Sequence, residues 1–310
     1  MRNVFVHKSI DIVNILKEYD VSFNSFVSMS IGYDDAVYIL LSEKIPERIN
    51  GIFVDTTADT IYSMLVLSVD WYTGELLSYE YHNLGRHMMN FHFIQPINNR
   101  ILLLGSRTCN QKGGPEKNAV LVDRSGTVSD EFCLGDGIED CIVTADGRII
   151  TSYFDEGVFG NYGWDHPIGS CGLISWDEKG NILWKADDPI YDCYAMNLDD
   201  EGNLWYYYYD EFNLVRTDFH KKVVYQPDIM GAAGFLLTAD SGYLIFDGGY
   251  DKHSEFRSAV ISHHEIKDYE RTEIIFQEKP LLIKNFKFRG SKALFLDHKN
   301  RLFVKQIVQI

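Results

Sequence analysis

The 310-residue sequence has little proline, little cysteine and no long hydrophobic run. Seven prolines stand against 24 glycines, and 45% of the residues are apolar and 24% charged. This composition excludes collagen-like, coiled-coil and disordered chains. No segment approaches the roughly 18 consecutive apolar residues that a membrane-spanning helix needs, and the N-terminus lacks the apolar core of a secretory signal. We therefore expect a soluble globular protein.

The cysteines show neither a disulfide framework nor a structural zinc site. There are five of them, an odd number, and none forms a CxxC pair. Disulfides belong to oxidising compartments. We therefore expect free thiols and a reducing, cytoplasmic location.

Basic residues are scarce as well. The sequence has 29 Lys and Arg against 45 Asp and Glu, which gives a net charge of -16. Such a chain is repelled by a nucleic-acid backbone or an anionic membrane surface unless a basic patch intervenes. The sequence has no basic run. We therefore expect neither nucleic acid nor a membrane as a partner.

One pattern occurs six times along the chain. Each copy is an apolar strand, a tight polar turn and a second apolar strand, as in FVSMSIGYDDAVYILL and AMNLDDEGNLWYYYY. When the copies are aligned, one turn position holds only Asp, Asn or Gly, the residue types that tolerate a positive φ. These residues are Asp35, Asn99, Gly147, Gly202, Gly242 and Asn300.

A second hairpin follows the first in five copies, and residues 3–20 supply the missing one from the other end of the chain. Four short strands per copy, closed by strands from both termini, are typical of a β-propeller. The sequence therefore predicts an all-β, six-bladed β-propeller. Its ring closes when two N-terminal strands complete the blade begun by two C-terminal strands.

The predicted propeller occupies residues 1–310 as a single domain. A seven-bladed ring would need another full copy within 46–60 or 279–290, and neither segment carries one. The blades are expected at approximately 24–84, 85–136, 137–189, 190–229, 230–286, and 287–310 plus 1–21.

Long connections mark one face of the predicted ring. The turns within hairpins are tight, whereas the links from second to third strand are long, at 42–60, 107–117, 155–171 and 248–257. These links share a face with the links between blades, where the central channel opens. Binding residues usually lie on loops held by a rigid scaffold, so we expect function on this face.

The segment 153–172 combines glycines with aromatic residues. Its glycines can adopt unusual backbone conformations, and its aromatic rings can line a pocket. Two interpretations stay open: a binding loop, or a loop packed over the ring by its own aromatic side chains. The alternating residues are Gly157, Gly160 and Gly163 with Phe159, Tyr162 and Trp164.

Acidic residues gather in the same predicted loops. Clustered carboxylates repel one another unless cations are present, so such a site suits Ca²⁺ or Mg²⁺, and a pair can also act as general acid and base. Asp140 and Asp192 precede cysteines at equivalent blade positions, and we predict that they face each other as metal ligands. The competing interpretation is a set of solvated acids that cap backbone amides.

The candidate site residues form two groups. The catalytic candidates are Glu139, Asp140, Asp192 and His87. The ligand-binding candidates are Asn90, Asp136, Tyr153, Asp155, Glu156, Phe159, Tyr162, Trp164, Tyr194 and Asp210.

Four short motifs occupy the middle third of the chain: GDGI at 135–138, YFDEGVFGNYGW at 153–164, PIG at 167–169 and DCYA at 192–195. In these motifs the sequence resembles a family of bacterial six-bladed propeller-like proteins of unknown function. The resemblance implies the fold and brings no activity with it.

The sequence favours a propeller that binds a small-molecule or peptide ligand in an acidic and aromatic pocket at the central channel. The ligand would be cationic or bridged by a metal ion. Two alternatives stay open. One is a metal-dependent hydrolase or lyase that uses a channel carboxylate as base. The other is a protein–protein interaction platform, which needs only a large rim and a protein partner.

Overall fold

The computed structural model describes residues 1–45, 48–49, 53–239, 242–250, 252, 255–262 and 264–308. The chain is an all-β, six-bladed propeller, as the repeat predicts. It divides into two compact units: unit 1 comprises Met1–Glu18, Val69–Leu77 and Cys193–Ile310, and unit 2 comprises Tyr19–Ser68 and Ser78–Asp192. Parts of the predicted connections 42–60 and 248–257 lie outside the described residues.

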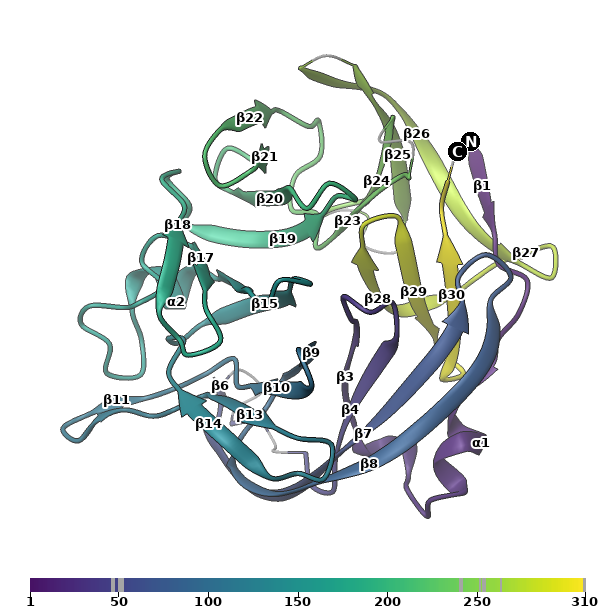
Figure 1. The fold of residues 1–310 in the computed structure, drawn as a ribbon. Helices are drawn as coiled ribbons and strands as arrows, with labels where there is room; N and C mark the ends of the chain where they lie inside the picture. The colour runs from purple at the N-terminus through teal and green to yellow at the C-terminus, as the bar shows by residue number, and fades with distance from the viewer. Residues whose placement is uncertain are drawn as a thin grey trace. The chain divides into compact units, whose positions relative to one another are not determined.

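Unit 2 carries three antiparallel four-stranded sheets (Figure 1). The first contains β3 (Phe26–Ile31), β4 (Val37–Ser42), β7 (Thr57–Asp70) and β8 (Glu75–Met89), and the tip of the β7–β8 hairpin counts with unit 1. The second contains β9 (Phe93–Ile97), β10 (Arg100–Leu104), β13 (Ala119–Val122) and β14 (Val128–Phe132). The third contains β15 (Ile138–Val143), β16 (Ile149–Tyr153), β17 (Leu173–Trp176) and β18 (Ile182–Lys185).

Short elements lie in the connections of unit 2. The hairpins β5 (Arg48–Ile49) with β6 (Phe53–Val54) and β11 (Asn110–Gln111) with β12 (Gly114–Pro115) each have two strands. A 3-10 turn, Phe23–Ser25, precedes β3, and α2 (Asp155–Phe159) follows β16.

Unit 1 carries the remaining three sheets. The first contains β19 (Asp192–Leu198), whose first residue counts with unit 2, and β20 (Leu204–Tyr209), β21 (Asn213–Thr217) and β22 (Lys222–Tyr225). The second contains β23 (Phe235–Leu237), β24 (Tyr243–Asp247), β25 (Phe256–Ser262) and β26 (Glu265–Phe276), with β27 (Lys279–Pro280) and β1 (Arg2–Phe5) paired to β26. The third contains β28 (Ile283–Arg289), β29 (Lys292–Asp297), β30 (Arg301–Gln306) and β2 (Ile10–Asp11).

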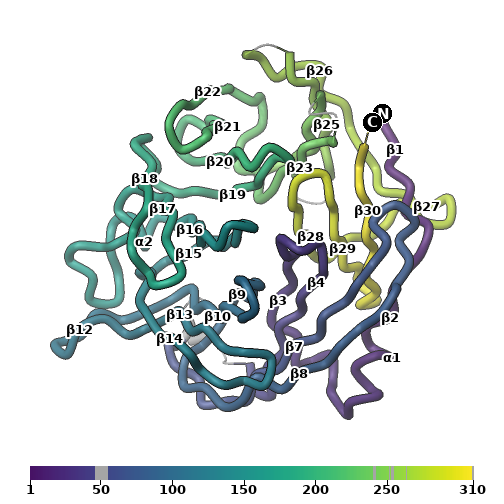
Figure 2. Tube along the Cα trace, viewed as in Figure 1, coloured from purple at the N-terminus to yellow at the C-terminus, as the bar shows by residue number. Residues whose placement is uncertain are grey.

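Strands from the N-terminus close the sheets of unit 1, as predicted (Figure 2). The division of strands differs from the prediction. The C-terminus supplies three strands of the last sheet and β2 supplies one, with Ile10 opposite Leu302. β1 instead joins the neighbouring sheet, where it runs parallel to β26 and Arg2 lies opposite Thr272.

A short helix, α1 (Ile12–Lys17), stands where the sequence predicts the second N-terminal strand, and β2 lies within the turn predicted at residues 8–11. The carboxylate of Asp11 accepts the backbone N–H of Asn14 at 3.0 Å and caps the helix. Ile12, Ile15 and Leu16 are buried, and their spacing of three and four residues is helical. The strand prediction overlooked this period, and it is wrong for these residues.

The core of each unit lies between neighbouring sheets. In unit 2 one cluster of buried side chains joins the first and second sheets and another joins the second and third, where Leu121 and Trp176 belong to the same cluster. In unit 1, equivalent clusters join consecutive sheets, and Leu214 shares one with Phe246. Because both faces of the inner strands are buried, these strands are apolar along most of their length, as in β4, where all six residues are buried and Ser42 is the polar one.

Four hairpin turns share one pattern of hydrogen bonds. In each, an Asp carboxylate accepts the backbone N–H groups two and four residues later at 2.8–3.1 Å, and its carbonyl accepts the N–H three residues later. The residue three positions after each Asp has a positive φ. The four acids are Asp123, Asp177, Asp199 and Asp297.

The predicted turn column is confirmed at Asp35, Gly147, Gly202 and Asn300, all of which have positive φ. In the second copy the positive φ is at Asn98 instead of the predicted Asn99. Ile97 pairs with Arg100 there, so the loop has two residues, and such loops favour positive φ at the first. The sixth predicted residue, Gly242, directly follows residues outside the described part. No helix in the described ranges is long and apolar enough to cross a bilayer.

The closure predicts unequal effects of two N-terminal substitutions. Ile10 in β2 is 4% exposed, whereas Phe5 in β1 is 51% exposed. We expect Ile10→Ala to lower the free energy of unfolding by about 2–4 kcal/mol, because it leaves a cavity against β30. Phe5→Ala, the control, should cost less than about 1 kcal/mol. Urea denaturation measures both, and equal losses would contradict the closing role of β2.

Candidate functional site

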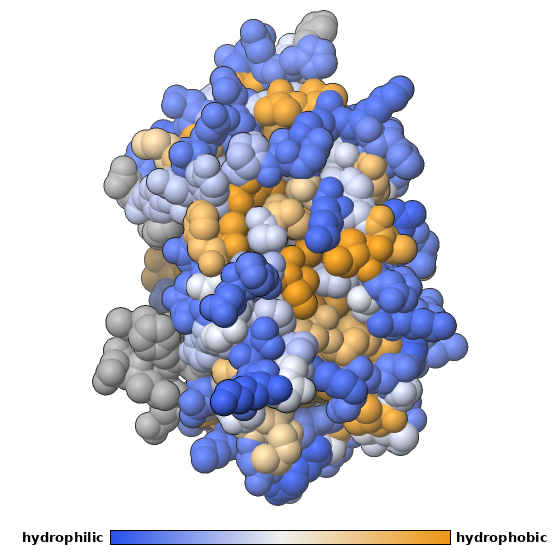
Figure 3. All heavy atoms as spheres, turned by 90° about the vertical axis from the view of Figure 1, so that its left-hand side faces the viewer, coloured by the Kyte–Doolittle hydropathy of each residue, from blue (hydrophilic) through white to orange (hydrophobic). Residues whose placement is uncertain are grey.

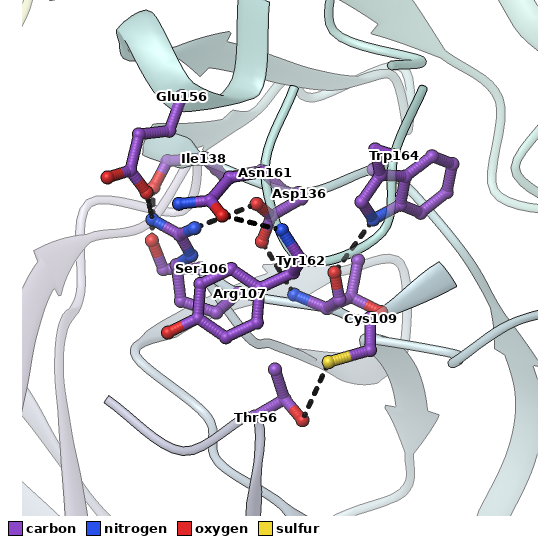
Figure 4. A network of polar contacts seen from close by, with 12 residues as sticks. Thr56, Ser106, Arg107, Cys109, Asp136, Ile138, Glu156, Asn161, Tyr162 and Trp164 are labelled. Carbon is purple, nitrogen blue, oxygen red and sulfur yellow. Dashed lines mark hydrogen bonds and ion pairs between the residues drawn. The ribbon is translucent and has the colours of Figure 1, made fainter. Parts of the chain in front are cut away.

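A buried polar network in unit 2 centres on Arg107 (Figure 4). The Arg107 guanidinium contacts Oδ2 of Asp136 at 2.9 Å and Oε2 of Glu156 at 2.5 Å. It also lies over the rings of Tyr162 and Phe154, at 4.3 and 5.1 Å from their centroids. One arginine therefore binds two carboxylates and two aromatic faces.

The two carboxylates beside Arg107 differ in environment. The side chain of Asp136 is 1% exposed and that of Glu156 is 34% exposed. Burial raises the pKa of Asp136, although the charge of Arg107 acts in the opposite direction. Burial favours a higher pKa for Glu156 as well. Hydrogen bonds from Asn161 and Arg107 outweigh this effect, so the pKa of Glu156 is lowered. Asp136 is thus the carboxylate that depends most on its partner.

The network holds the 153–172 segment against the 107–110 segment. The backbone N–H of Asn110 donates to the carbonyl of Tyr162 at 3.0 Å, and Nε1 of Trp164 donates to the carbonyl of Thr108 at 2.7 Å. These contacts favour the interpretation of 153–172 as a loop packed by its own aromatic side chains. Arg107 itself was not among the predicted residues. Its segment, 107–117, also holds two lysines, so charge alone does not single it out.

Three predicted ligand contacts are buried. Asp136 is 1%, Tyr153 0% and Trp164 6% exposed. The Tyr153 hydroxyl donates to the carbonyl of Leu134 and accepts from Oγ1 of Thr151 at 3.0 Å. The polar atoms of these three side chains are engaged inside unit 2, and a direct role in binding stays a prediction.

Two predicted acids from separate segments act through their charge on a third, Asp192. Burial raises the pKa of Asp192 to about 7, and the negative charges of Glu139 and Asp155 add to the increase. Glu139 comes from β15, Asp155 from the start of α2, and Asp192 from the start of β19. The buried Oδ1 atom of Asp192 has no hydrogen-bond partner among the described residues. The carboxylates of Glu139 and Asp155 therefore repel that of Asp192, which is partly buried.

Two exposed aromatic rings come from the same segments as Asp155 and Asp192. Phe159, the last residue of α2, is 65% exposed, and Tyr191, directly before Asp192, is 41% exposed. Their ring centroids are 5.6 Å apart. On the side that carries α2 and β18, hydrophobic side chains gather between hydrophilic ones (Figure 3). The sequence singled out Phe159 but missed Tyr191, whose signal was its place beside Asp192.

Asp140 makes the local contact that the capping interpretation predicts: its Oδ1 accepts the backbone N–H of Cys141 at 2.9 Å. Within the described ranges, no three His, Cys, Asp or Glu side chains are grouped closely enough to hold a metal ion. The metal role of Asp140 and Asp192, with Ca²⁺ or Mg²⁺, stays a prediction.

His87 and Asn90 lie at the end of β8. Nε2 of His87 is 2.9 Å from the carbonyl oxygen of Leu84, and its ring lies 5.3 Å from that of Phe91 at 71°. Asn90 is 4% exposed and donates through Nδ2 to the carbonyl of Asp55 at 2.9 Å. Both side chains are hydrogen-bonded within the fold, which is what a purely structural role predicts. Their role in catalysis or ligand binding stays a prediction.

The last two predicted residues, Tyr194 and Asp210, belong to unit 1. Asp210 is exposed, and it follows Tyr209, which is in the same aromatic cluster as Tyr194. The Tyr194 hydroxyl is hydrogen-bonded to that of Tyr250. Four ring centroids lie 6.1–6.5 Å from that of Tyr194, those of Tyr207, Tyr209, Phe212 and Tyr250.

The buried network predicts a large cost for losing Arg107. Arg107→Met should lower the free energy of unfolding by about 3–5 kcal/mol at pH 8, because Asp136 remains as a buried charge without its partner. The pKa of Asp136, already raised by burial, should rise further. The cost should therefore be smaller at pH 5, where the carboxyl can keep its proton.

Arg100→Met is the matched control for this prediction. Arg100 also binds two carboxylates, but its partners Asp130 and Glu178 are 50% and 41% exposed, so the expected cost is about 1 kcal/mol or less. Chemical denaturation at both pH values compares the two variants. Equal losses, or a loss independent of pH in Arg107→Met, would contradict the burial argument.

Comparison with other proteins identifies the fold. No family model and no curated protein matches the sequence. Hsv2 from Kluyveromyces marxianus covers 90% of this chain and 75% of its own, with 11% identity and a TM-score of 0.51. A catalytically inactive variant of virginiamycin B lyase from Staphylococcus aureus, crystallised with quinupristin, covers 90% and 94%, with 10% identity and a TM-score of 0.49. At 11% identity the likeness to Hsv2 is one of propeller fold alone.

Proposed function

We propose that the chain is a ligand-binding propeller whose ligand carries a positive charge. The proposed acidic aromatic site consists of Glu139, Asp155, Asp192, Phe159 and Tyr191. The observation that supports it is the state of Asp192: its pKa is raised to about 7 by burial and by two neighbouring carboxylates. A cation placed among these groups would relieve their repulsion, and exposed rings add cation–π attraction.

The Arg107 network supports the proposal because it fixes part of this site. Glu156, held by Arg107, is the second residue of α2, and the same short helix carries Asp155 and Phe159. A site whose side chains are already ordered loses less entropy when a ligand binds. The buried residues thus position the exposed ones.

Unit 1 offers the same combination of residue types. Tyr209 and Tyr250 are 41% and 50% exposed, and the exposed acids Asp210 and Glu211 adjoin Tyr209 in the chain. Exposed aromatic rings beside exposed acids support the proposal that the ligand is a cation. None of the five cysteines, all of which lie in the described part of the chain, forms a disulfide, which supports our proposal of a cytoplasmic protein. The resemblance to bacterial propeller-like proteins adds no activity to it.

A second candidate function rests on the same carboxylate. A general base works best when its pKa lies near the operating pH, and the pKa of Asp192 is raised to about 7. The alternative is therefore a hydrolase or lyase with Asp192 as base. The interaction platform is favoured by a different observation, the exposed Ile182 and Leu183 of β18, at 45% and 52%.

The raised pKa of Asp192 predicts how stability changes with pH. The folded state keeps the proton up to about pH 7, whereas the unfolded state loses it near the ordinary value of 3.8. The free energy of unfolding should therefore fall as the pH rises through this window. Asp192→Asn should be more stable than the natural chain by about 1–2 kcal/mol at pH 8, after allowance for solvent screening, and equally stable near pH 4.

Thermal unfolding at a series of pH values measures this difference. Asp165→Asn removes an equal charge from an exposed position in the connection that carries Asp155 and serves as the control. If both variants show the same pH dependence of stability, the pKa of Asp192 is not raised in the folded state.

Ligand titration tests the function itself. Choline, as a quaternary ammonium probe, should bind at least tenfold more tightly than its neutral isostere 3,3-dimethyl-1-butanol. Asp192→Asn and Phe159→Ala should each weaken choline binding about three- to tenfold, and Asp165→Asn should not. Equal binding of the two probes would overturn the cationic ligand, and a response to Ca²⁺ instead of choline would support the metal-bridged form.

A further inference from the structure

Unit 1 contains a groove that none of the predicted site residues lines. It lies between the β26–β27 turn with its following residues and the turn that joins β29 to β30, and its volume is about 390 Å³. This falls within the range of small-molecule sites. The lining of the groove combines two kinds of side chain, apolar and basic, and this combination indicates the chemistry of a ligand.

The charged lining of the groove is positive. Lys279, Lys299 and Arg301 line it, with Asp297 as the acidic lining residue. The Asp297 side chain is 5% exposed and already bound by Arg301, at 2.8 Å from Nη2, and by the backbone N–H of Lys299 at 2.9 Å. Its charge is therefore satisfied within the turn. Within the described part of the chain, neither lysine has an ion-pair partner, so the groove carries uncompensated positive charge.

Arg301 is held in place with donors to spare. Its Nε and Nη2 atoms bind Oδ2 of Asp297 at 2.9 and 2.8 Å, and its guanidinium lies 5.2 and 5.4 Å from the ring centroids of Phe276 and Phe303. A guanidinium has five N–H donors, and Nη1 has no hydrogen-bond partner among the described residues. A fixed arginine with unused donors is suited to a carboxylate.

Apolar side chains form the other part of the lining. Phe276, Leu281 and Leu282 all line the groove, and Leu282 is 73% exposed. The backbone N–H of Leu281 donates to the carbonyl of Ile274 at 2.7 Å, which fixes this segment on β26. A leucine exposed to this degree beside two free lysines offers contact to an alkyl chain whose head group is anionic.

We propose that this groove binds a small amphipathic carboxylate, an acid with an apolar chain. The carboxylate would lie at Lys279, Lys299 and the free donors of Arg301, and the chain would cover Leu282 and Leu281. The proposal is independent of the acidic aromatic site: it concerns other residues, the opposite ligand charge and unit 1 alone. A net charge of -16 makes such an anion site unexpected from composition.

Calorimetric titration of the full chain tests the proposal with three probes below their aggregation concentrations. Octanoate has charge and chain, 1-octanol has the chain alone, and acetate has the charge alone. We expect octanoate to bind at least tenfold more tightly than either of the others. If octanol binds as tightly as octanoate, or acetate does, the amphipathic carboxylate is the wrong ligand class.

Variants locate the binding in the groove. Replacing both Lys279 and Lys299 with Gln should weaken octanoate about tenfold and leave octanol unchanged, whereas Leu282→Ser should weaken both about threefold or more. All three side chains are exposed, so thermal unfolding should show unchanged stability. The control replaces Lys112 and Lys185 of unit 2 with Gln. Octanoate binding that survives the Lys279 and Lys299 replacements, or falls equally in the control, would overturn the site.

Discussion

The register of the hairpins is the constraint on which the rest of the structure depends. Side chains alternate between the faces of a strand, so a slip of one residue would exchange the contents of two neighbouring cores. The turns fix the register because an Asp carboxylate binds two backbone N–H groups, as Asp177 binds those of Lys179 and Asn181 at 2.9 and 2.8 Å. Asp123, Asp199 and Asp297 make the same turn in hairpins of other sheets, so the register of those hairpins is fixed in the same way.

This local origin explains how much of the fold the sequence predicts. Turn residues and apolar runs act over a few positions, so six copies could be recognised and the closure by N-terminal strands followed from them. The errors arise where a long-range contact decides. β1 pairs with β26, 270 positions away at Arg2 and Thr272, and no local pattern distinguishes that partner from β30. The helix α1 is an error of another kind, because the local spacing of Ile12, Ile15 and Leu16 already indicated a helix and was overlooked.

The candidate site shows the limit more sharply, because identical residue types have opposite environments. Asp136 and Asp155 both belong to acidic connections in the sequence, yet Asp136 is 1% exposed and Asp155 is exposed at the start of α2. The difference is set by Arg107, which comes from another connection and binds Asp136 at 2.9 Å. The sequence predicts which loops hold the acids and the aromatic rings, but three-dimensional contacts decide which of these side chains the solvent reaches.

The distribution of the few bases links the buried network to the proposed ligand. Three arginines bind acids that are almost fully buried: Arg107 with Asp136, Arg216 with Asp199 and Arg301 with Asp297, whose side chains are 1%, 7% and 5% exposed. A buried carboxylate without a partner is costly, so folding consumes positive charge inside the sheets and turns. Fewer bases are then left to balance the surface acids. The repulsion around Asp192 therefore follows from the same scarcity of bases that the sequence shows at once, and a cationic ligand would supply the charge that the chain lacks there.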